Sequence, residues 1–141
     1  MILVDTAPLI ALIDTGQEAH RRCVKTYYDL DRSMLTTWCC FTEAMYFLHQ
    51  LRGWQAQNIL WQFVEREALA LHSNTFKEQI RMKELMKKYR DVPMDLADAS
   101  LVATAETLNN RQIFTLDKDF FVYRLYGKEA FEVVPSNRVG I

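Results

Sequence analysis

The sequence predicts a single α/β domain with a roughly five-stranded, mainly parallel sheet and helices on both faces. Short apolar runs alternate along the chain with longer stretches of helical spacing, which is the pattern of a parallel sheet covered on both sides. The 141 residues, of which 50% are hydrophobic and 25% charged, suffice for one core. No repeat, linker or low-complexity segment divides them. We therefore expect one domain over residues 1–141.

The first half of the chain predicts three strands and four helices. Thr6 is a suitable helix cap and Pro8 a suitable first-turn residue, while Gly53 separates two helices. The expected elements are, in order, a strand over 2–4, helices over 8–14 and 17–31, a strand over 34–37, helices over 42–51 and 55–65, and a strand over 69–72.

The second half predicts two helices and two further strands. Pro93 breaks the first helix, and Asn109 and Asn110 close the second. The expected elements are a helix over 75–89, a helix over 99–108 opened by residues 95–98, a strand over 112–116, a polar turn over 117–119 and a strand over 131–134 that ends at Pro135.

The net charge, the cysteines and the N-terminus restrict the partners and the compartment that we expect. The formal net charge is −1, so a nucleic acid would have to bind at a local basic patch. Cys23, Cys39 and Cys40 form no CxxC pair. The N-terminus lacks a basic leader and a cleavage site, and no apolar run approaches the ~20 residues of a membrane span. A cytoplasmic protein without membrane association is the expectation.

Acidic residues occur where the expected elements meet. Asp5 follows the first strand, Asp117 and Asp119 follow the fourth, Asp98 lies at the opening of the preceding helix, and Glu43 lies in the helix after the second strand. Ligand sites of parallel sheets lie beyond the carboxyl ends of the strands. Glu43 is also the only charged residue in the neutral run 38–48, and an isolated acid in such a run has a cost or a function.

Each acid also has a structural interpretation. An aspartate at a strand end or a helix start is often only a cap, so Asp5, Asp98 and Asp117 are each either caps or ligands. Asp95 and Asp119 fit a capping or surface position better.

A site built from several carboxylates needs a cation. Crowded carboxylates raise each other's pKa unless a cation neutralises them. Oxygen-only ligands suit Mg²⁺ or Mn²⁺, which also accept substrate phosphate oxygens. The pattern therefore predicts metal-dependent hydrolysis of phosphodiesters.

Four segments follow one another in order over nearly the whole chain: ILVDTAPLIALID, FTEAMYFL, PMDLADASLVATAE and IFTLDKDF. Together they resemble the motifs of PIN-domain ribonucleases, and more narrowly of VapC-type toxins from type II toxin–antitoxin pairs. By this resemblance Asp5, Glu43 and Asp98 match the three main metal-site acids. The fourth acid is Asp117 or Asp119, and strand geometry favours Asp117.

The resemblance implies a PIN-like fold and a metal-dependent endoribonuclease. It implies Mg²⁺ or Mn²⁺ as the cofactor, RNA as the substrate and a small cognate antitoxin protein as a partner, and homodimers are common among such proteins. Thr6 and Thr115 match hydroxyl positions of the metal site.

Two other features allow two interpretations each. The segment 77–90 carries six basic and two acidic side chains, which fits a solvated helix face or a surface that gathers RNA phosphates. Trp54 and Trp61 share one helix face, which fits core packing or a surface for an antitoxin or a second copy.

Two alternative functions fit the same sequence. An aspartate after a first parallel strand also serves Mg²⁺-dependent phosphatases and phosphoacceptor domains, although VDTAPL lacks a second aspartate two residues on. A PIN-like module that binds RNA or protein without cutting is the other alternative, which metal-dependent RNA cleavage would distinguish.

Overall fold

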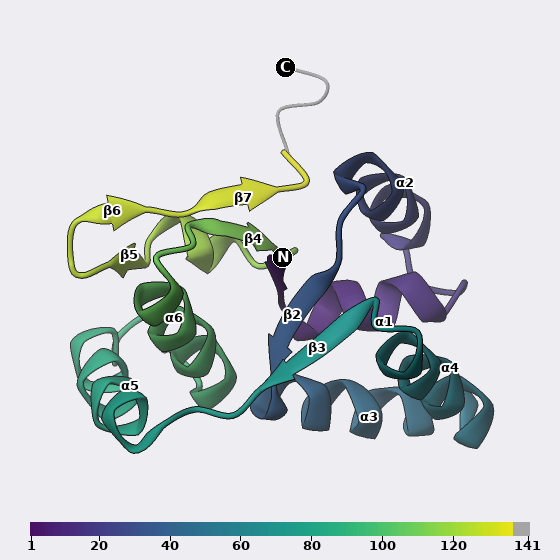
Figure 1. Cartoon of the computed structure of the whole chain (residues 1–141), viewed down its shortest axis with the longest axis horizontal. Coiled ribbons are helices and arrows are strands. Elements are labelled where there is room, and N and C mark those ends of the chain that lie inside the picture. The colour runs from purple at the N-terminus through teal and green to yellow at the C-terminus, as the bar shows by residue number, and fades with distance from the viewer. Residues whose placement is uncertain (137–141) are drawn as a thin grey trace.

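The computed structural model, which describes residues 1–136, confirms the α/β architecture (Figure 1). Its main sheet has five strands in the order β3-β2-β1-β4-β7, and every pair of neighbours is parallel. These strands are β1 (Ile2–Val4), β2 (Met34–Thr37), β3 (Leu69–His72), β4 (Gln112–Phe114) and β7 (Glu132–Val134).

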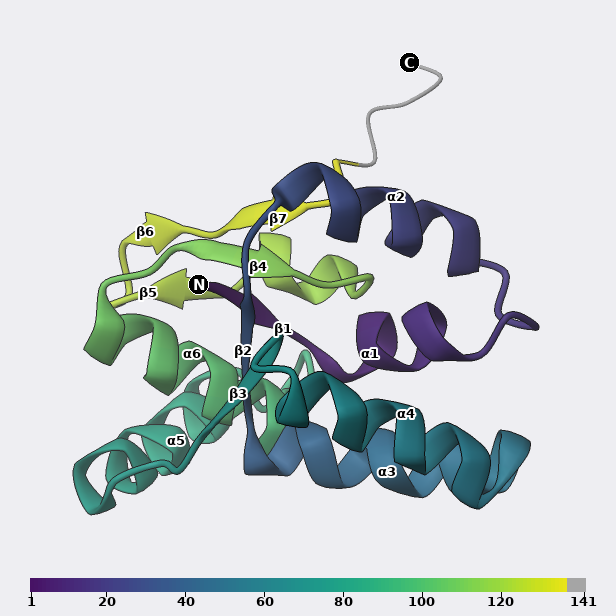
Figure 2. The ribbon, with the colours of Figure 1, turned by 45° about the vertical axis from the view of Figure 1, so that its right-hand side comes forward.

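Helices cover both faces of this sheet, as the sequence predicts (Figure 2). They are α1 (Thr6–Ile13), α2 (His20–Leu30), α3 (Trp38–Arg52), α4 (Trp54–Glu65), α5 (Phe76–Lys88) and α6 (Leu96–Leu108). Alternate residues of β1 point to opposite faces. Ile2 and Val4 pack in the core cluster on the side of α1 to α4, whereas Leu3 packs in the cluster beneath α5 and α6.

Two helices begin earlier than the periodicity of apolar residues predicts. The helix expected from residue 42 begins at Trp38, because the Thr37 hydroxyl caps it by accepting from the Cys40 N–H at 3.3 Å. The helix expected from residue 99 begins at Leu96, because Asp95 Oδ1 accepts from the Asp98 N–H at 2.8 Å. These corrections place Asp98 in the first turn of α6 and Glu43 in the second turn of α3.

Smaller boundary corrections affect other elements. The helix expected from residue 8 with Thr6 as its cap begins at Thr6, because Asp5 is the cap. The helix expected from residue 17 begins at His20, the strand expected over 112–116 ends at Phe114, and the strand expected from 131 begins at Glu132.

The segment between the polar turn and the last strand contains structure that the sequence analysis did not predict. A 3₁₀ helix, η1 (Lys118–Phe121), follows the turn. The short strands β5 (Arg124–Leu125) and β6 (Glu129–Ala130) then form an antiparallel pair. Phe120, Tyr123 and Leu125 from this segment are fully buried in the core beneath α5 and α6.

Within residues 1–136, every helix is too short or too polar to span a membrane.

Candidate active site

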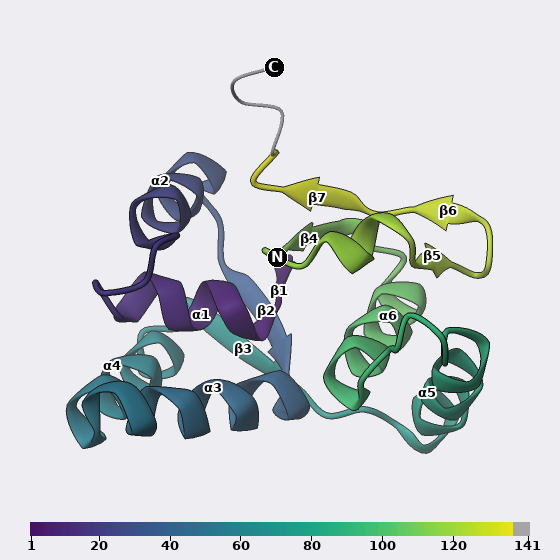
Figure 3. The same ribbon diagram turned by 180° about the vertical axis from the view of Figure 1, so that it is seen from behind.

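The carboxyl edge of the sheet receives the ends of β1 and β4 and the starts of α1, α3 and α6 (Figure 3). Contacts between these segments show that they converge. The Thr6 hydroxyl lies 3.4 Å from the Cys40 carbonyl, and Cys40 Sγ lies 3.9 Å from the Ala97 carbonyl. α1, α3 and α6 therefore meet at one place.

Asp5 lies at the centre of this edge, and both of its carboxylate oxygens are held. Its Oδ1 accepts from the Thr6 N–H at 2.7 Å, so Asp5 caps α1. Its Oδ2 accepts from the Thr115 hydroxyl at 2.8 Å. Asp5 is 6% exposed. It is therefore both the cap of α1 and a buried carboxylate of the candidate site.

Asp98 lies in the first turn of α6 and is almost as buried, at 7% exposed. Its Oδ2 accepts from the Tyr123 hydroxyl at 2.9 Å. Asp95, in contrast, is exposed and caps α6, which confirms its predicted capping position.

Glu43 reaches the same region from α3. Its Oε1 accepts from the Thr6 hydroxyl at 2.9 Å, and Thr6 follows Asp5 directly. The isolated acid of the neutral run is therefore half-buried at the sheet edge and hydrogen-bonded to a residue of the candidate site.

Asp117 joins the cluster through Thr115. The Asp117 N–H donates to Thr115 Oγ1 at 3.0 Å, and the same hydroxyl donates to Asp5. The Asp117 side chain caps η1 by accepting from the Asp119 N–H at 2.9 Å. Both aspartates are half-buried, and Asp119 is the one further along the chain from the sheet edge.

The electrostatics of the site show that three of these acids interact. Burial raises the pKa of Asp5 to about 6, against hydrogen bonds from Thr115 and Thr6 that lower it, and the Asp117 charge raises it further. Burial also raises the pKa of Asp98 to about 8, with a further contribution from the Asp5 charge.

Asp117 follows the same rule, since burial is the main cause of its raised pKa and the neighbouring Asp119 charge adds to it. None of the salt bridges found within residues 1–136 includes any of the four acids Asp5, Glu43, Asp98 and Asp117. When these acids ionise, no basic side chain within residues 1–136 is paired with them to offset their negative charge.

The donor set fits a hard divalent cation in its chemistry. In the described part of the chain, no three His, Cys, Asp or Glu side chains already stand in a geometry that would hold a metal ion. Mg²⁺ is nevertheless bound in many proteins through one or two carboxylates, with waters and substrate phosphates as the remaining ligands. Carboxylate and hydroxyl oxygens at this edge are ligands of that kind.

Sequence reasoning did not identify two neighbours of these acids, Tyr123 and Cys40. Tyr123 contacts Asp98 directly, and Cys40 Sγ lies 4.0 Å from Asp5 Oδ1. Burial raises the pKa of the Cys40 thiol to about 12, so it is a neutral group there. The three-residue spacing of Phe120 and Tyr123 could have indicated a shared buried face, but not the contact with Asp98.

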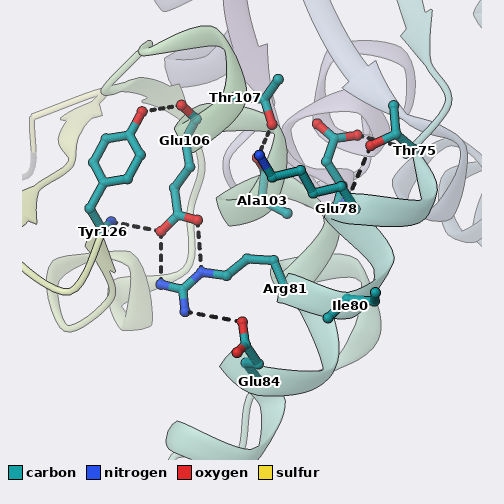
Figure 4. A pocket seen from close by; sticks show the side chains of 10 residues that line it. Thr75, Glu78, Ile80, Arg81, Glu84, Ala103, Glu106, Thr107 and Tyr126 are labelled. Carbon is teal, nitrogen blue, oxygen red and sulfur yellow. Dashed lines mark hydrogen bonds and ion pairs between the residues drawn. The ribbon is translucent and has the colours of Figure 1, made fainter.

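A pocket of about 630 Å³ between α5, α6 and Tyr126 lies apart from these acids (Figure 4). Arg81 and Glu106 form a two-pronged pair across it, with N–O distances of 2.8 and 3.0 Å. Glu106 Oε2 also accepts from the Tyr126 N–H at 2.6 Å. Because these charges satisfy one another and none of the candidate acids lines the pocket, we place the site at the sheet edge.

Comparisons with known proteins agree with this architecture. The PIN domain family model matches residues 2–125, and no curated protein matches the chain. Among solved structures, VapC20 from Mycobacterium tuberculosis, a toxin that cleaves the sarcin–ricin loop, superposes with a TM-score of 0.78 at 17% identity, covering 84% of this chain and 92% of that one.

Two toxin–antitoxin structures are also similar to the chain. A complex from Klebsiella pneumoniae gives a TM-score of 0.65 at 20% identity, covering 85% of this chain and 90% of that one. VapBC2 from Rickettsia felis, bound to a DNA fragment from its promoter, gives a TM-score of 0.66 at 12% identity, covering 94% of this chain and 98% of that one. Because the PIN domain family model matches residues 2–125, which is most of the sequence, the chain belongs to the PIN domain family.

Proposed function

We propose that this protein is a metal-dependent endoribonuclease that hydrolyses phosphodiester bonds of RNA and acts as the toxin of a toxin–antitoxin pair. The observation that carries the proposal is the cluster of buried Asp5 and Asp98 with half-buried Asp117, which forms no salt bridge within residues 1–136. Glu43 is linked to this cluster through its hydrogen bond with Thr6. Membership of the PIN domain family and the likeness to VapC structures support the same function.

In this proposal Asp5, Glu43, Asp98 and Asp117 hold Mg²⁺ or Mn²⁺, with Asp119 at the periphery. A divalent ion lowers the pKa of a water molecule and offsets charge on the reacting phosphoryl group. The Thr115 hydroxyl fixes Asp5 and the start of the Asp117 turn, while the Thr6 hydroxyl fixes Glu43. These bonds hold the carboxylates in place before an ion or a substrate arrives.

The basic side chains of α5 supply attraction for RNA phosphates in this proposal. Arg81 is engaged with Glu106 and Glu84. Lys83, Lys87 and Lys88 form no salt bridge with any residue in 1–136. Lysines without a carboxylate partner on a nearly neutral protein would give RNA binding that weakens as salt rises.

A small antitoxin protein is the proposed partner, since two of the similar structures are toxin–antitoxin assemblies. Trp54 and Trp61 on α4 are 62% and 38% exposed, and Trp61 packs edge-on against Phe41. Exposed tryptophans of this kind favour a protein interface, with the antitoxin or with a second copy in a homodimer. A short adjacent reading frame for a small DNA-binding protein would support the pairing, as would cytoplasmic location of both products.

The test is cleavage of single-stranded RNA by the purified chain. We expect cleavage to stop in chelator and to return with Mg²⁺ or Mn²⁺ but not with Ca²⁺, which prefers larger and looser coordination. Attack by water on phosphorus should leave 5′-phosphate and 3′-hydroxyl ends. Full activity in chelator, or cyclic phosphate products, would contradict the proposal.

A further inference from the structure

Tyr123 places a buried hydroxyl on one of the candidate acids. The residue is fully buried, and its hydroxyl donates to Asp98 Oδ2 at 2.9 Å. Among residues 1–136, no donor contacts the other carboxylate oxygen, Oδ1. The hydrogen bond therefore restricts rotation of the carboxylate while one oxygen stays available for a further partner.

An aromatic cluster fixes the position of the Tyr123 ring. Tyr89 and Phe120 meet it edge-to-face, with centroids 5.1 and 5.0 Å away, and Phe120 in turn packs edge-to-face on Phe131 at 5.4 Å. Such pairs are favourable beyond the area that they bury. The hydroxyl cannot leave Asp98 without disturbing this cluster.

The backbone of Tyr123 connects the same residue to the other side of the site. Its N–H donates to the Asp119 carbonyl at 3.1 Å, within the 3₁₀ helix that Asp117 caps. Tyr123 thus joins the segment that carries Asp117 to the helix that carries Asp98.

We propose that Tyr123 is a positioning residue of the nuclease site, whose hydroxyl holds the Asp98 carboxylate in the orientation that a divalent cation requires. This inference rests on the proposed function. Hydrogen bonds that orient a metal ligand from outside the site are typically worth about 10- to 100-fold in metal affinity or activity. Loss of the Tyr123 hydroxyl should therefore weaken ion binding by a factor in that range.

The experiment compares Tyr123→Phe with Tyr89→Phe in the full chain. Both changes remove one hydroxyl from the same aromatic cluster and keep the ring. The Tyr89 hydroxyl, however, accepts from the Arg124 N–H at 3.1 Å and does not contact an acid of the site. The first readout is the Mn²⁺ concentration that gives half of the ion-induced rise in melting temperature, and the second is kcat and KM for RNA cleavage at a fixed, limiting Mn²⁺ concentration.

We expect Tyr123→Phe to need about 10- to 100-fold more Mn²⁺ for half-maximal stabilisation. It should also lose kcat at limiting Mn²⁺ with little change in KM for RNA, and saturating Mn²⁺ should restore much of the loss. Tyr89→Phe should match the wild type in its Mn²⁺ response. Melting without ions checks that both variants fold.

Three results would overturn the inference. One is a Tyr123→Phe variant with the wild-type Mn²⁺ midpoint, even if its ion-free melting temperature falls, because the hydroxyl would then be only structural. Another is an equal shift in both variants, which would assign the effect to cluster packing. A wild-type protein that shows no Mn²⁺ response would overturn the proposed function, and the role of Tyr123 with it.

Discussion

At the scale of single residues, the acids of the site serve both as helix caps and as a charged cluster. Asp5 and Asp117 each cap the element that follows them, and each also takes part in the cluster through Thr115. The two interpretations that the sequence left open are therefore not exclusive. The hydrogen bond of the cap restricts rotation of the carboxylate, so each of these side chains is held in place.

We expect Asp98→Asn to abolish RNA cleavage while raising stability in chelator at pH 7.5. The asparagine oxygen can still accept from the Tyr123 hydroxyl. At pH 7.5 the unfolded chain ionises Asp98, whereas burial and the Asp5 charge raise its pKa to about 8 in the folded protein, so folding must protonate this carboxyl or bury its charge, and asparagine removes that cost. A gain of about 1–3 kcal/mol would raise the melting temperature by several degrees.

Asp95→Asn is the matched control for Asp98→Asn. Asp95 is an exposed cap of the same helix, and asparagine caps almost as well as aspartate. The Asp95 charge also contributes to the raised pKa of Asp5 and Asp98, although burial is the largest cause for both. This variant should therefore cut RNA nearly normally and melt only slightly above the wild type in chelator. Wild-type cleavage by Asp98→Asn would remove Asp98 from the site.

The choice between Asp117 and Asp119 can be tested in the same way. The Asp117 charge acts on both Asp5 and Asp98, and the hydroxyl that holds Asp5 also fixes the Asp117 N–H. Asp117→Asn should therefore lose most cleavage activity over a range of Mn²⁺ concentrations, whereas Asp119→Asn should keep much of it. An inactive Asp119→Asn beside an active Asp117→Asn would reverse the assignment.

At the scale of elements, helix starts are the part of the site that sequence periodicity located least well. The strand expected over 34–37 is correct, but Thr37 is both its last residue and the cap of α3. Apolar periodicity cannot reveal that one residue ends a strand and begins a helix. The β5–β6 pair was missed for a related reason, since two-residue strands are too short to show alternation.

The contact between α5 and α6 explains part of the basic run in α5. Arg81 is held by Glu106, which is 8% exposed and also accepts from the Tyr126 N–H. Glu106→Ala should lower the free energy of unfolding by about 2 kcal/mol or more, because it leaves Arg81 and that N–H without their partner. Urea denaturation measures this loss.

Glu84→Ala is the control for this contact. Glu84 is 63% exposed and lies 3.8 Å from Arg81, so its loss should change stability by less than about 0.5 kcal/mol. RNA cleavage below the melting temperature should persist in both variants, since neither residue lies at the sheet edge. Loss of cleavage in folded Glu106→Ala would show that the pocket of Figure 4 contributes to the site.

At the scale of the whole molecule, the parallel sheet brings together acids that are far apart in sequence. Asp5 and Thr115 are 110 residues apart and share a hydrogen bond of 2.8 Å. The sequence could predict this meeting, because the carboxyl ends of parallel strands share one edge. It could not predict the Tyr123 contact, which depends on how η1 and the following hairpin fold back onto α6.

The same cluster should make the stability of the ion-free protein fall as pH rises. The pKa of Asp5 rises from 3.8 to about 6 on folding, and that of Asp98 from 3.8 to about 8, mainly through burial. The folded protein therefore binds more protons than the unfolded chain between about pH 4 and 8. Stability from these two groups is fully present below pH 3.8 and is lost as pH rises through their folded pKa values.

Two other acids have the opposite effect, so the range of the measurement matters. Hydrogen bonds from Gln17 and Arg52 lower the pKa of Asp14, and bonds from His72 and Thr75 lower that of Glu78 in spite of its burial. Their contribution is present above their ordinary pKa values and is lost as pH falls below about 4. Measurements above pH 5 therefore leave out the contributions of Asp14 and Glu78.

Denaturation between pH 5 and 8.5, with chelator or with Mg²⁺, should show this dependence. The pKa shifts are about two units for Asp5 and about four for Asp98, and about four of these six units fall between pH 5 and 8.5. The free energy of unfolding in chelator should therefore fall by roughly 5 kcal/mol across the range. Mg²⁺ should reduce the fall, because a bound cation stabilises the ionised carboxylates and stabilises the folded state by mass action. Asp98→Asn should show a shallower fall in chelator and a small response to Mg²⁺. Identical plots of unfolding free energy against pH with and without Mg²⁺ in the wild type would mean that the cluster does not bind the ion. The raised pKa values would then reflect burial and mutual repulsion of the acids, with no role in metal binding.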